Sequence, residues 1–126
     1  MEIKLGTDGY RSFEGFGGDG RCKVAVTGFA TPNGMAAYVY GGVAPHIGGA
    51  AVSGAGSQES SCRFVRPTHK DHILAEAVAD ILSKGTGQTV YVAAGFHLDD
   101  ITKEEIAAVV ENGRTAAQEA LRLLSE

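Results

Sequence analysis

The side chains best suited to acid–base or ligand chemistry are four histidines, and all four fall in three short polar segments. Residues 41–49 read Gly-Gly-Val-Ala-Pro-His-Ile-Gly-Gly, residues 68–72 read Thr-His-Lys-Asp-His, and residues 95–100 read Gly-Phe-His-Leu-Asp-Asp. Each segment lies at the end of an expected strand or the start of an expected helix, where loops commonly carry binding sites. This clustering predicts one ligand site built from all three segments.

An anionic, planar ligand suits the chemistry of these segments. The helix expected after Thr68 offers free amide groups at the positive end of its dipole, where a phosphate would be stabilised. The cation Lys70 and the imidazoles of His69 and His72 are expected nearby. Gly48 and Gly49 lack side chains and would let a flat ring approach the backbone closely.

Two further histidines would contact the ring itself. His46 and His97 would donate hydrogen bonds to ring carbonyls or to a reduced, anionic ring, and Asp99 would orient an imidazole. Each has a plainer alternative: the histidines would satisfy loop carbonyls, and Asp71 would only cap the helix. The candidate ligand-binding residues are His46, Gly48, Gly49, His69, Lys70, Asp71, His97 and Asp99.

A metal site is the main chemical alternative. His69 and His72 lie three residues apart at a helix start, so their imidazoles would share one side. His46, His97 or Asp99 would complete a tetrahedral set for zinc. Such spacing is common by chance and the glutamate of a His-Glu-x-x-His hydrolase is missing, so we expect no metal. No Gly-x-Ser-x-Gly segment supports a hydrolytic triad, and we expect no catalytic residues.

The first half of the chain is expected to form strands. Residues 21–29 and 35–40 alternate on either side of Asn33-Gly34, a tight-turn signal, and predict a hairpin. Residues 47–52 and 61–65 supply two more strands, and residues 2–5 would add one at the amino terminus.

From Thr68 onward the apolar period becomes helical, with Thr68 as the expected cap and Gly85 and Gly87 as the stop. Residues 89–94 form a short β-branched run, and a second helix begins near Thr102, where Thr-Lys-Glu-Glu is typical of a capping box; Asp100 is an alternative cap.

These elements predict a single α+β domain over residues 1–126. Its expected order is strand-strand-strand-strand-helix-strand-helix, with room for an extra amino-terminal strand, and two helices cover one face of a mainly antiparallel sheet. The strands over 35–40 and 48–52 are small or apolar on both sides, so the uncovered face predicts a homodimer. The alternative is that amino-terminal strands fold over it.

Charge and hydropathy exclude several partners. With 11 basic and 15 acidic residues the net charge is −4, which argues against nucleic acid. No apolar run approaches the length of a membrane span, so we expect a soluble, cytoplasmic protein with no membrane partner.

Taken together, three motifs resemble the LpdD family. They are Gly-Gly-x-x-Pro-His-Ile-Gly-x-x-Ala, then Thr-His-Lys-Asp-His, then Val-x-Ala-Gly-x-His-Leu-Asp-x-Ile-Thr-Lys-Glu-Glu-Ile, and they span residues 41–106. Members are small proteins associated with gallate-decarboxylase-type UbiD enzymes, which use prenylated FMN. The sequence departs from the family at the glycine-rich residues 13–20 and at residues 53–61, which would form the rim of the site.

The resemblance implies a dimeric fold like that of the eukaryotic proteasome assembly chaperones. It also implies a non-catalytic role: holding reduced prenylated FMN and delivering it to an apo UbiD-type decarboxylase. Two other hypotheses stay open on the residues alone. One is a small lyase or isomerase that uses histidines or a metal, and the other is an interaction module that assists assembly without a small ligand.

Overall fold

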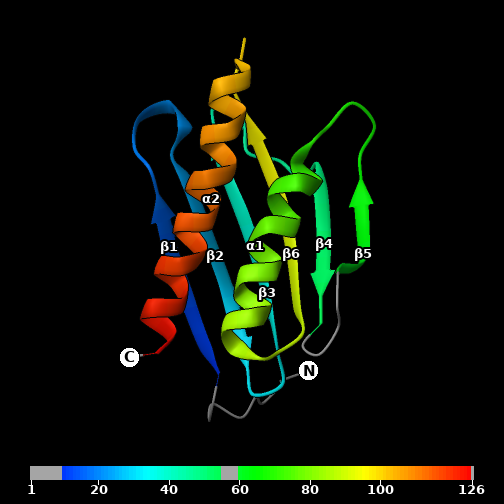
Figure 1. The fold of residues 1–126 in the computed structure, drawn as a ribbon, viewed down its shortest axis with the longest axis vertical. Helices are drawn as coiled ribbons and strands as arrows, with labels where there is room; N and C mark the ends of the chain where they lie inside the picture. Colours follow the sequence, from blue (N-terminus) through cyan, green and yellow to red (C-terminus); the bar gives the residue numbers. More distant parts are fainter. Residues whose placement is uncertain (1–9, 55–59, 126) are drawn as a thin grey trace, which may run out of the picture.

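The computed structural model describes residues 10–54 and 60–125, with the backbone alone for residues 60–62 (Figure 1). The strand expected over residues 2–5 lies outside the described residues. In chain order the elements are β1 (Arg11–Gly17), the short 3-10 helix η1 (Gly20–Cys22), β2 (Val24–Thr31), β3 (Gly34–Gly42), β4 (Gly49–Ser53), β5 (Ser60–Val65), α1 (Asp71–Thr86), β6 (Val90–His97) and α2 (Lys103–Leu124).

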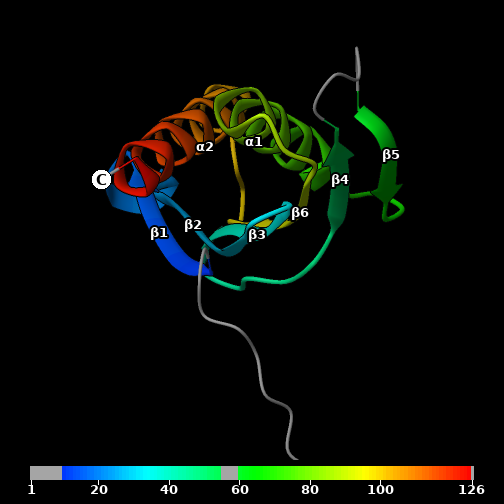
Figure 2. The ribbon, with the colours of Figure 1, turned by 90° about the horizontal axis from the view of Figure 1, so that it is seen from below.

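The strands form one sheet in the order β1-β2-β3-β6-β4-β5. Among the described strands, β3 and β6 run parallel and every other neighbouring pair is antiparallel. Figure 2 shows α1 and α2 side by side on one face of this sheet, with the other face uncovered by helices. The predicted α+β class, the mainly antiparallel sheet and the placement of both helices on one face are therefore confirmed.

An additional strand does precede the predicted hairpin, and it is β1. Its buried residues alternate, Phe13, Gly15 and Gly17 facing α2. A Cβ at Gly15 would overlap the carbonyl oxygen of Ala116, and one at Gly17 would overlap that of Asn112. Gly15 and Gly17 thus let α2 lie directly on β1. Their role is in packing a helix on a strand and not in forming a turn.

The predicted first helix has a different start from the one expected. Its N-cap is Lys70, with no side-chain cap. Thr68 adopts φ 63°, a left-handed conformation that costs a β-branched residue strain, so its role as cap was wrong. The end is as expected, because Gly87 forms a left-handed C-cap.

The second helix begins with the predicted capping box. Thr102 accepts from the Glu105 amide, and the Glu105 side chain accepts in return from the Thr102 amide. Asp100, the alternative cap, lies in a left-handed turn before it.

The core lies between the helices and the sheet and is close-packed. Its largest fully buried side chains are Leu82, Val78, Val24, Val26, Val39, Val90 and Val92.

Strand direction determines where the polar segments meet. Because β3 and β6 are parallel, both end at the same edge of the sheet, with Gly42 opposite His97. Strand β4 is antiparallel to β6 and begins at this edge, and β5 ends there and leads into α1 (Figure 1). The loops β3–β4 and β5–α1 and the end of β6 therefore converge at one end of the molecule.

Candidate functional site

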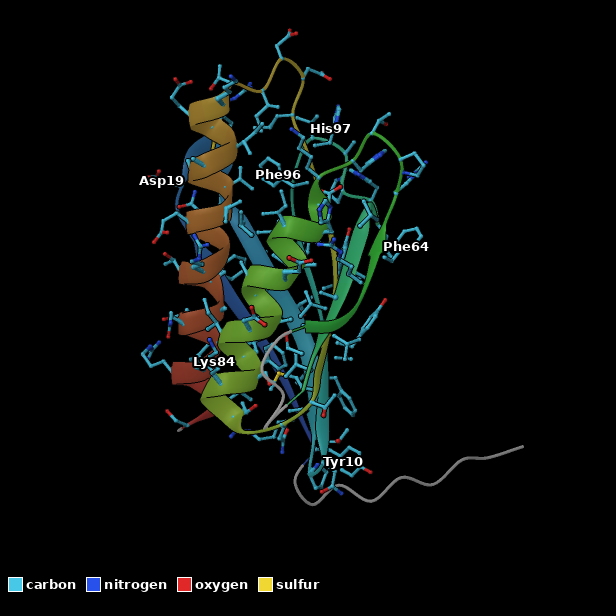
Figure 3. The ribbon with its side chains drawn as sticks, turned by 45° about the vertical axis from the view of Figure 1, so that its right-hand side comes forward. Tyr10, Asp19, Phe64, Lys84, Phe96 and His97 are labelled. Carbon is cyan, nitrogen blue, oxygen red and sulfur yellow. The ribbon has the colours of Figure 1, made fainter. Side chains whose placement is uncertain are left out.

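Three of the four histidines gather at this end of the sheet. The ring centroid of His46 lies 5.1 Å from that of His69 and 6.4 Å from that of His97, both in edge-on orientation. Figure 3 shows His97 at the same end as the start of α1. The segments that the sequence singled out thus form one cluster, with one histidine from each.

Both ring nitrogens of His46 lie close to an oxygen atom. Its Nδ1 lies 3.0 Å from the carbonyl oxygen of Ala44, and its Nε2 lies 3.2 Å from Oδ2 of Asp71. The other carboxylate oxygen of Asp71 accepts a hydrogen bond of 3.0 Å from the backbone amide of Phe96. Asp71 is buried, so this carboxylate joins the β3–β4 loop, α1 and β6.

His69 faces the same carboxylate. Its Nδ1 lies 2.9 Å from the carbonyl oxygen of Pro67. A Cβ at Gly48 would overlap Oδ2 of Asp71 and would lie 2.8 Å from Cδ2 of His69, so both side chains rest against this glycine. A ring nitrogen of His46, one of His69 and a carboxylate oxygen of Asp71 all lie within 4.8 Å of one another.

The remaining glycine and the helix start pack tightly. A Cβ at Gly49 would overlap the backbone amide nitrogen of His72, so the missing side chain lets α1 begin against β4. The space above Gly48 and Gly49 is therefore occupied by the protein itself, and their contact with a flat ring stays a prediction. Lys70 is exposed beside the cluster. Nδ1 of His72 is buried without a hydrogen-bond partner among the described residues.

His97 and Asp99 form the outer rim. Nε2 of His97 lies 3.1 Å from Oδ1 of Asp99, and the two side chains are 50% and 84% exposed. Asp99, which was expected to orient an imidazole, lies against that of His97 on the solvent side of the cluster. Both groups are accessible to a ligand that approaches from solvent.

Two tyrosines beside the cluster escaped the sequence analysis. Tyr38 donates a hydrogen bond of 2.8 Å to the carbonyl oxygen of His46, and its ring stacks on Tyr40 at 4.9 Å between centroids. Burial raises the pKa of the Tyr38 hydroxyl, with smaller contributions from Tyr40 and Asp71. Their spacing on one side of a strand was the available signal, but core packing explains that spacing equally well.

An open cleft of about 340 Å³ lies next to the cluster on the uncovered face of the sheet. Phe16, Ala25 and Tyr40 stand in register on β1, β2 and β3, and Tyr40 is opposite Gly95, which the backbone of His46 covers. The cleft is lined by Phe16, Gly20, Arg21, Lys23, Ala25, Tyr40, Gly41, Gly42, Val43 and Leu98.

Two cations border the cleft. The ammonium of Lys23 lies 4.8 Å from the ring centroid of Phe16. Arg21 is engaged by Glu105, to which its Nε donates at 2.6 Å, so Lys23 is the cation more available to an anionic ligand. The cleft is small for a ligand site but combines aromatic walls with a positive charge.

Large apolar side chains stand exposed on the uncovered face of the sheet. Phe29 is 42% exposed, Phe64 is 54% exposed and Tyr91 is 45% exposed.

Within the described ranges, neither α-helix is long and apolar enough to cross a membrane.

Comparison with solved structures shows the same fold in a chaperone complex for yeast 20S proteasome assembly. The two chains are 12% identical and superpose with a TM-score of 0.59 over 93% of this chain and 96% of the other. This confirms the expected likeness in fold.

Comparison with curated protein sequences gives no significant match. A family model does match, over residues 18–125, and it describes a prenylated flavin chaperone LpdD-like domain. The match covers all three histidine segments and both helices, and on this basis the chain belongs to the LpdD-like prenylated flavin chaperone family.

Proposed function

We propose that this protein is a non-catalytic chaperone that binds reduced prenylated FMN and delivers it to an apo UbiD-type decarboxylase. The observation that carries the proposal is the meeting of three histidine segments beside an aromatic cleft, in a chain of this family. A cargo protein needs a site that is accessible from solvent, and the exposed rim at His97 and Asp99 meets that need.

The residues around the cluster suit different parts of such a ligand. A flat ring fits the aromatic walls at Phe16 and Tyr40, since ring binding needs apolar surface with few oriented polar groups. Lys70 at the start of α1 and Lys23 beside the cleft are the cations available for a phosphate. His97, on the rim, is placed to donate to a ring oxygen or to a reduced, anionic ring.

The buried carboxylate of Asp71 limits where an anion can lie. It occupies the inner side of the cluster, so a phosphate placed there would face a like charge. We therefore place the phosphate on the outer side, toward Lys70, and assign Asp71 to positioning His46 and His69. Gly48 and Gly49 contribute by letting these side chains and α1 approach the sheet.

We also propose that two copies pair through the uncovered face of the sheet. An exposed apolar surface that includes Phe29, Phe64 and Tyr91 is typical of a protein interface. Two-fold homodimers are the commonest oligomers, and such pairing would cover these side chains without another partner.

The test of function is an anaerobic titration of the purified protein with reduced prenylated FMN, with reduced FMN and oxidised FMN as controls. We expect binding of the reduced prenylated form, and the loaded protein should activate apo-decarboxylase more than free cofactor at the same concentration. Absence of binding, or equal activation by free cofactor, would refute the chaperone role.

A further inference from the structure

We propose that His46, His69 and Asp71 form a binding site for a divalent first-row transition metal such as Zn²⁺. Nε2 of both imidazoles and Oδ2 of the carboxylate would be the ligands. This inference does not depend on the flavin, because it concerns only side chains that already face one another. It also differs from the zinc set considered from sequence, since His72 is not in the group.

The two imidazoles present the correct nitrogen. The ring nitrogens Nδ1 of His46 and His69 face the backbone carbonyls of Ala44 and Pro67, at 3.0 and 2.9 Å. A carbonyl oxygen only accepts, so each Nδ1 carries the proton and each neutral ring keeps a lone pair on Nε2. A backbone carbonyl that holds one ring nitrogen is the usual support of a metal-binding histidine.

The third ligand is held in the same way. Oδ1 of Asp71 accepts from the amide of Phe96, which fixes the carboxylate and leaves Oδ2 toward His46. All three side chains therefore have one polar atom anchored to the backbone and another directed into the cluster. The anchors come from three separate segments of the chain, so the three side chains are held near one another before any ligand binds.

The contact between His46 and Asp71 is better explained by a metal than by a shared proton. Nε2 of His46 is buried and has no hydrogen-bond partner in the described part of the chain, although Oδ2 of Asp71 is only 3.2 Å away. In a hydrogen bond the proton lies close to the line between the donor and acceptor atoms. A tetrahedral metal ion instead lies to one side of the line that joins two of its ligand atoms. For tetrahedral zinc with bonds of about 2.0–2.1 Å, two ligand atoms are about 3.3 Å apart.

The ligand types indicate which metals fit. The three ligand atoms lie within 4.8 Å of one another. To reach the ligand spacing of a bound metal, the side chain of His69, on the loop before α1, must move toward the other two ligands by a fraction of that distance. Two imidazoles and one carboxylate suit zinc, iron(II) or cobalt(II) rather than calcium or magnesium, which prefer oxygen ligands. Three protein ligands also leave a coordination position open for water or for an oxygen atom of a bound molecule.

The test is a titration of the chelator-treated full chain with Zn²⁺ by calorimetry and with Co²⁺ by visible absorption, without flavin. We expect one metal per chain and Co²⁺ bands of four- or five-coordinate nitrogen–oxygen ligation. Asp71→Asn and His69→Ala should weaken binding by more than about 100-fold, since loss of an outer partner alone costs 10–100-fold. His72→Gln is the matched control and should bind as the parent does, because the His72 side chain is not in the group.

The Asp71→Asn variant is designed to fold. Its amide oxygen can still accept from Phe96, and its NH₂ group can donate to Nε2 of His46. Failure of the parent to bind either metal overturns the site. Equal binding by the parent, Asp71→Asn and His69→Ala also overturns it, as does an equal loss of binding in His72→Gln. If Asp71→Asn does not fold, His69→Ala decides alone. The chaperone proposal is judged separately, by flavin titration of metal-free protein.

Discussion

Nε2 of His46 lies 3.2 Å from Oδ2 of Asp71, which ties the loop between β3 and β4 to the first residue of α1. Through its other oxygen the same carboxylate holds the amide of Phe96 near the end of β6. One buried side chain therefore joins all three polar segments of the site. Its loss should affect both the fold and any ligand.

The two roles of Asp71 can be separated by substitution. Asp71→Ala leaves the amide of Phe96 without its acceptor in a half-buried position and should lower the free energy of unfolding by about 1–3 kcal/mol. Asp71→Asn keeps that acceptor and should lose less. Urea unfolding of both variants checks this order, and an equal loss in the two would show that the hydrogen bond to Phe96 contributes little.

Flavin binding should depend on the charge at the start of α1. Lys70→Ala removes an exposed cation beside the cluster and should weaken binding of reduced prenylated FMN by about tenfold, as expected from about 1.5 kcal/mol for a charged hydrogen bond. Lys84→Ala removes the same charge from the last turn of α1 and is the matched control. Affinities are measured anaerobically by fluorescence. Equal affinities of the two variants would show that the phosphate does not bind at the start of α1.

Much of this arrangement was accessible from sequence because it depends on local signals. The turn at Asn33-Gly34, the stop at Gly87 and the capping box at Thr102 each act over a few residues, and all are present. The grouping of the histidine segments followed from their places at element ends. The parallel pairing of β3 with β6 then brings those ends together.

What escaped prediction depends on distant partners. Strand β1 was not recognised because glycines occupy two of its buried positions, and their role is visible only with α2 lying across them. Thr68 resembles a cap in sequence, but the chain turns left-handed there and Lys70 takes the N-cap position. The amide that Asp71 binds belongs to Phe96, which no spacing rule connects to a helix start.

Dimer formation should fail when charge is placed on the uncovered face. Tyr91→Glu puts a carboxylate on the sheet, where Tyr91 is 45% exposed, and should yield monomers in sedimentation or light-scattering measurements. Ile106→Glu is the control, since Ile106 is 37% exposed but lies on α2. A dimeric Tyr91→Glu variant, or a parent that is already monomeric, would rule out pairing through this face.

Packing of α2 on β1 should be sensitive to one methyl group. In Gly15→Ala the new Cβ would overlap the backbone of Ala116, which cannot move without displacing α2, so we expect a loss of about 1–3 kcal/mol from overpacking. Gly34→Ala is the control, because a Cβ there meets its nearest neighbour, the carbonyl oxygen of Thr89, at an ordinary 3.5 Å. Similar melting temperatures for Gly15→Ala and the parent would contradict the close approach of helix and strand.

Acid stability should depend on the pair formed by Arg21 and Glu105. The hydrogen bond from Arg21 lowers the pKa of the Glu105 carboxyl below its ordinary 4.5, and the bond from the Thr102 amide lowers it further. A carboxyl whose pKa is lowered by folding stabilises the folded state above its unfolded pKa and loses that contribution as pH falls through the folded value. The effect is therefore present at neutral pH and disappears below pH 4.5.

Glu105→Gln keeps a side chain that serves in a capping box but removes the titrating group, so the fall in stability below pH 4.5 should be shallower than in the parent. Glu104→Gln, one residue earlier and without an ion pair in the described part of the chain, should follow the parent curve. Urea unfolding at a series of pH values distinguishes these outcomes. If the free energy of unfolding of Glu105→Gln and of the parent fell in parallel with pH, the ion pair between Arg21 and Glu105 would not contribute to acid unfolding.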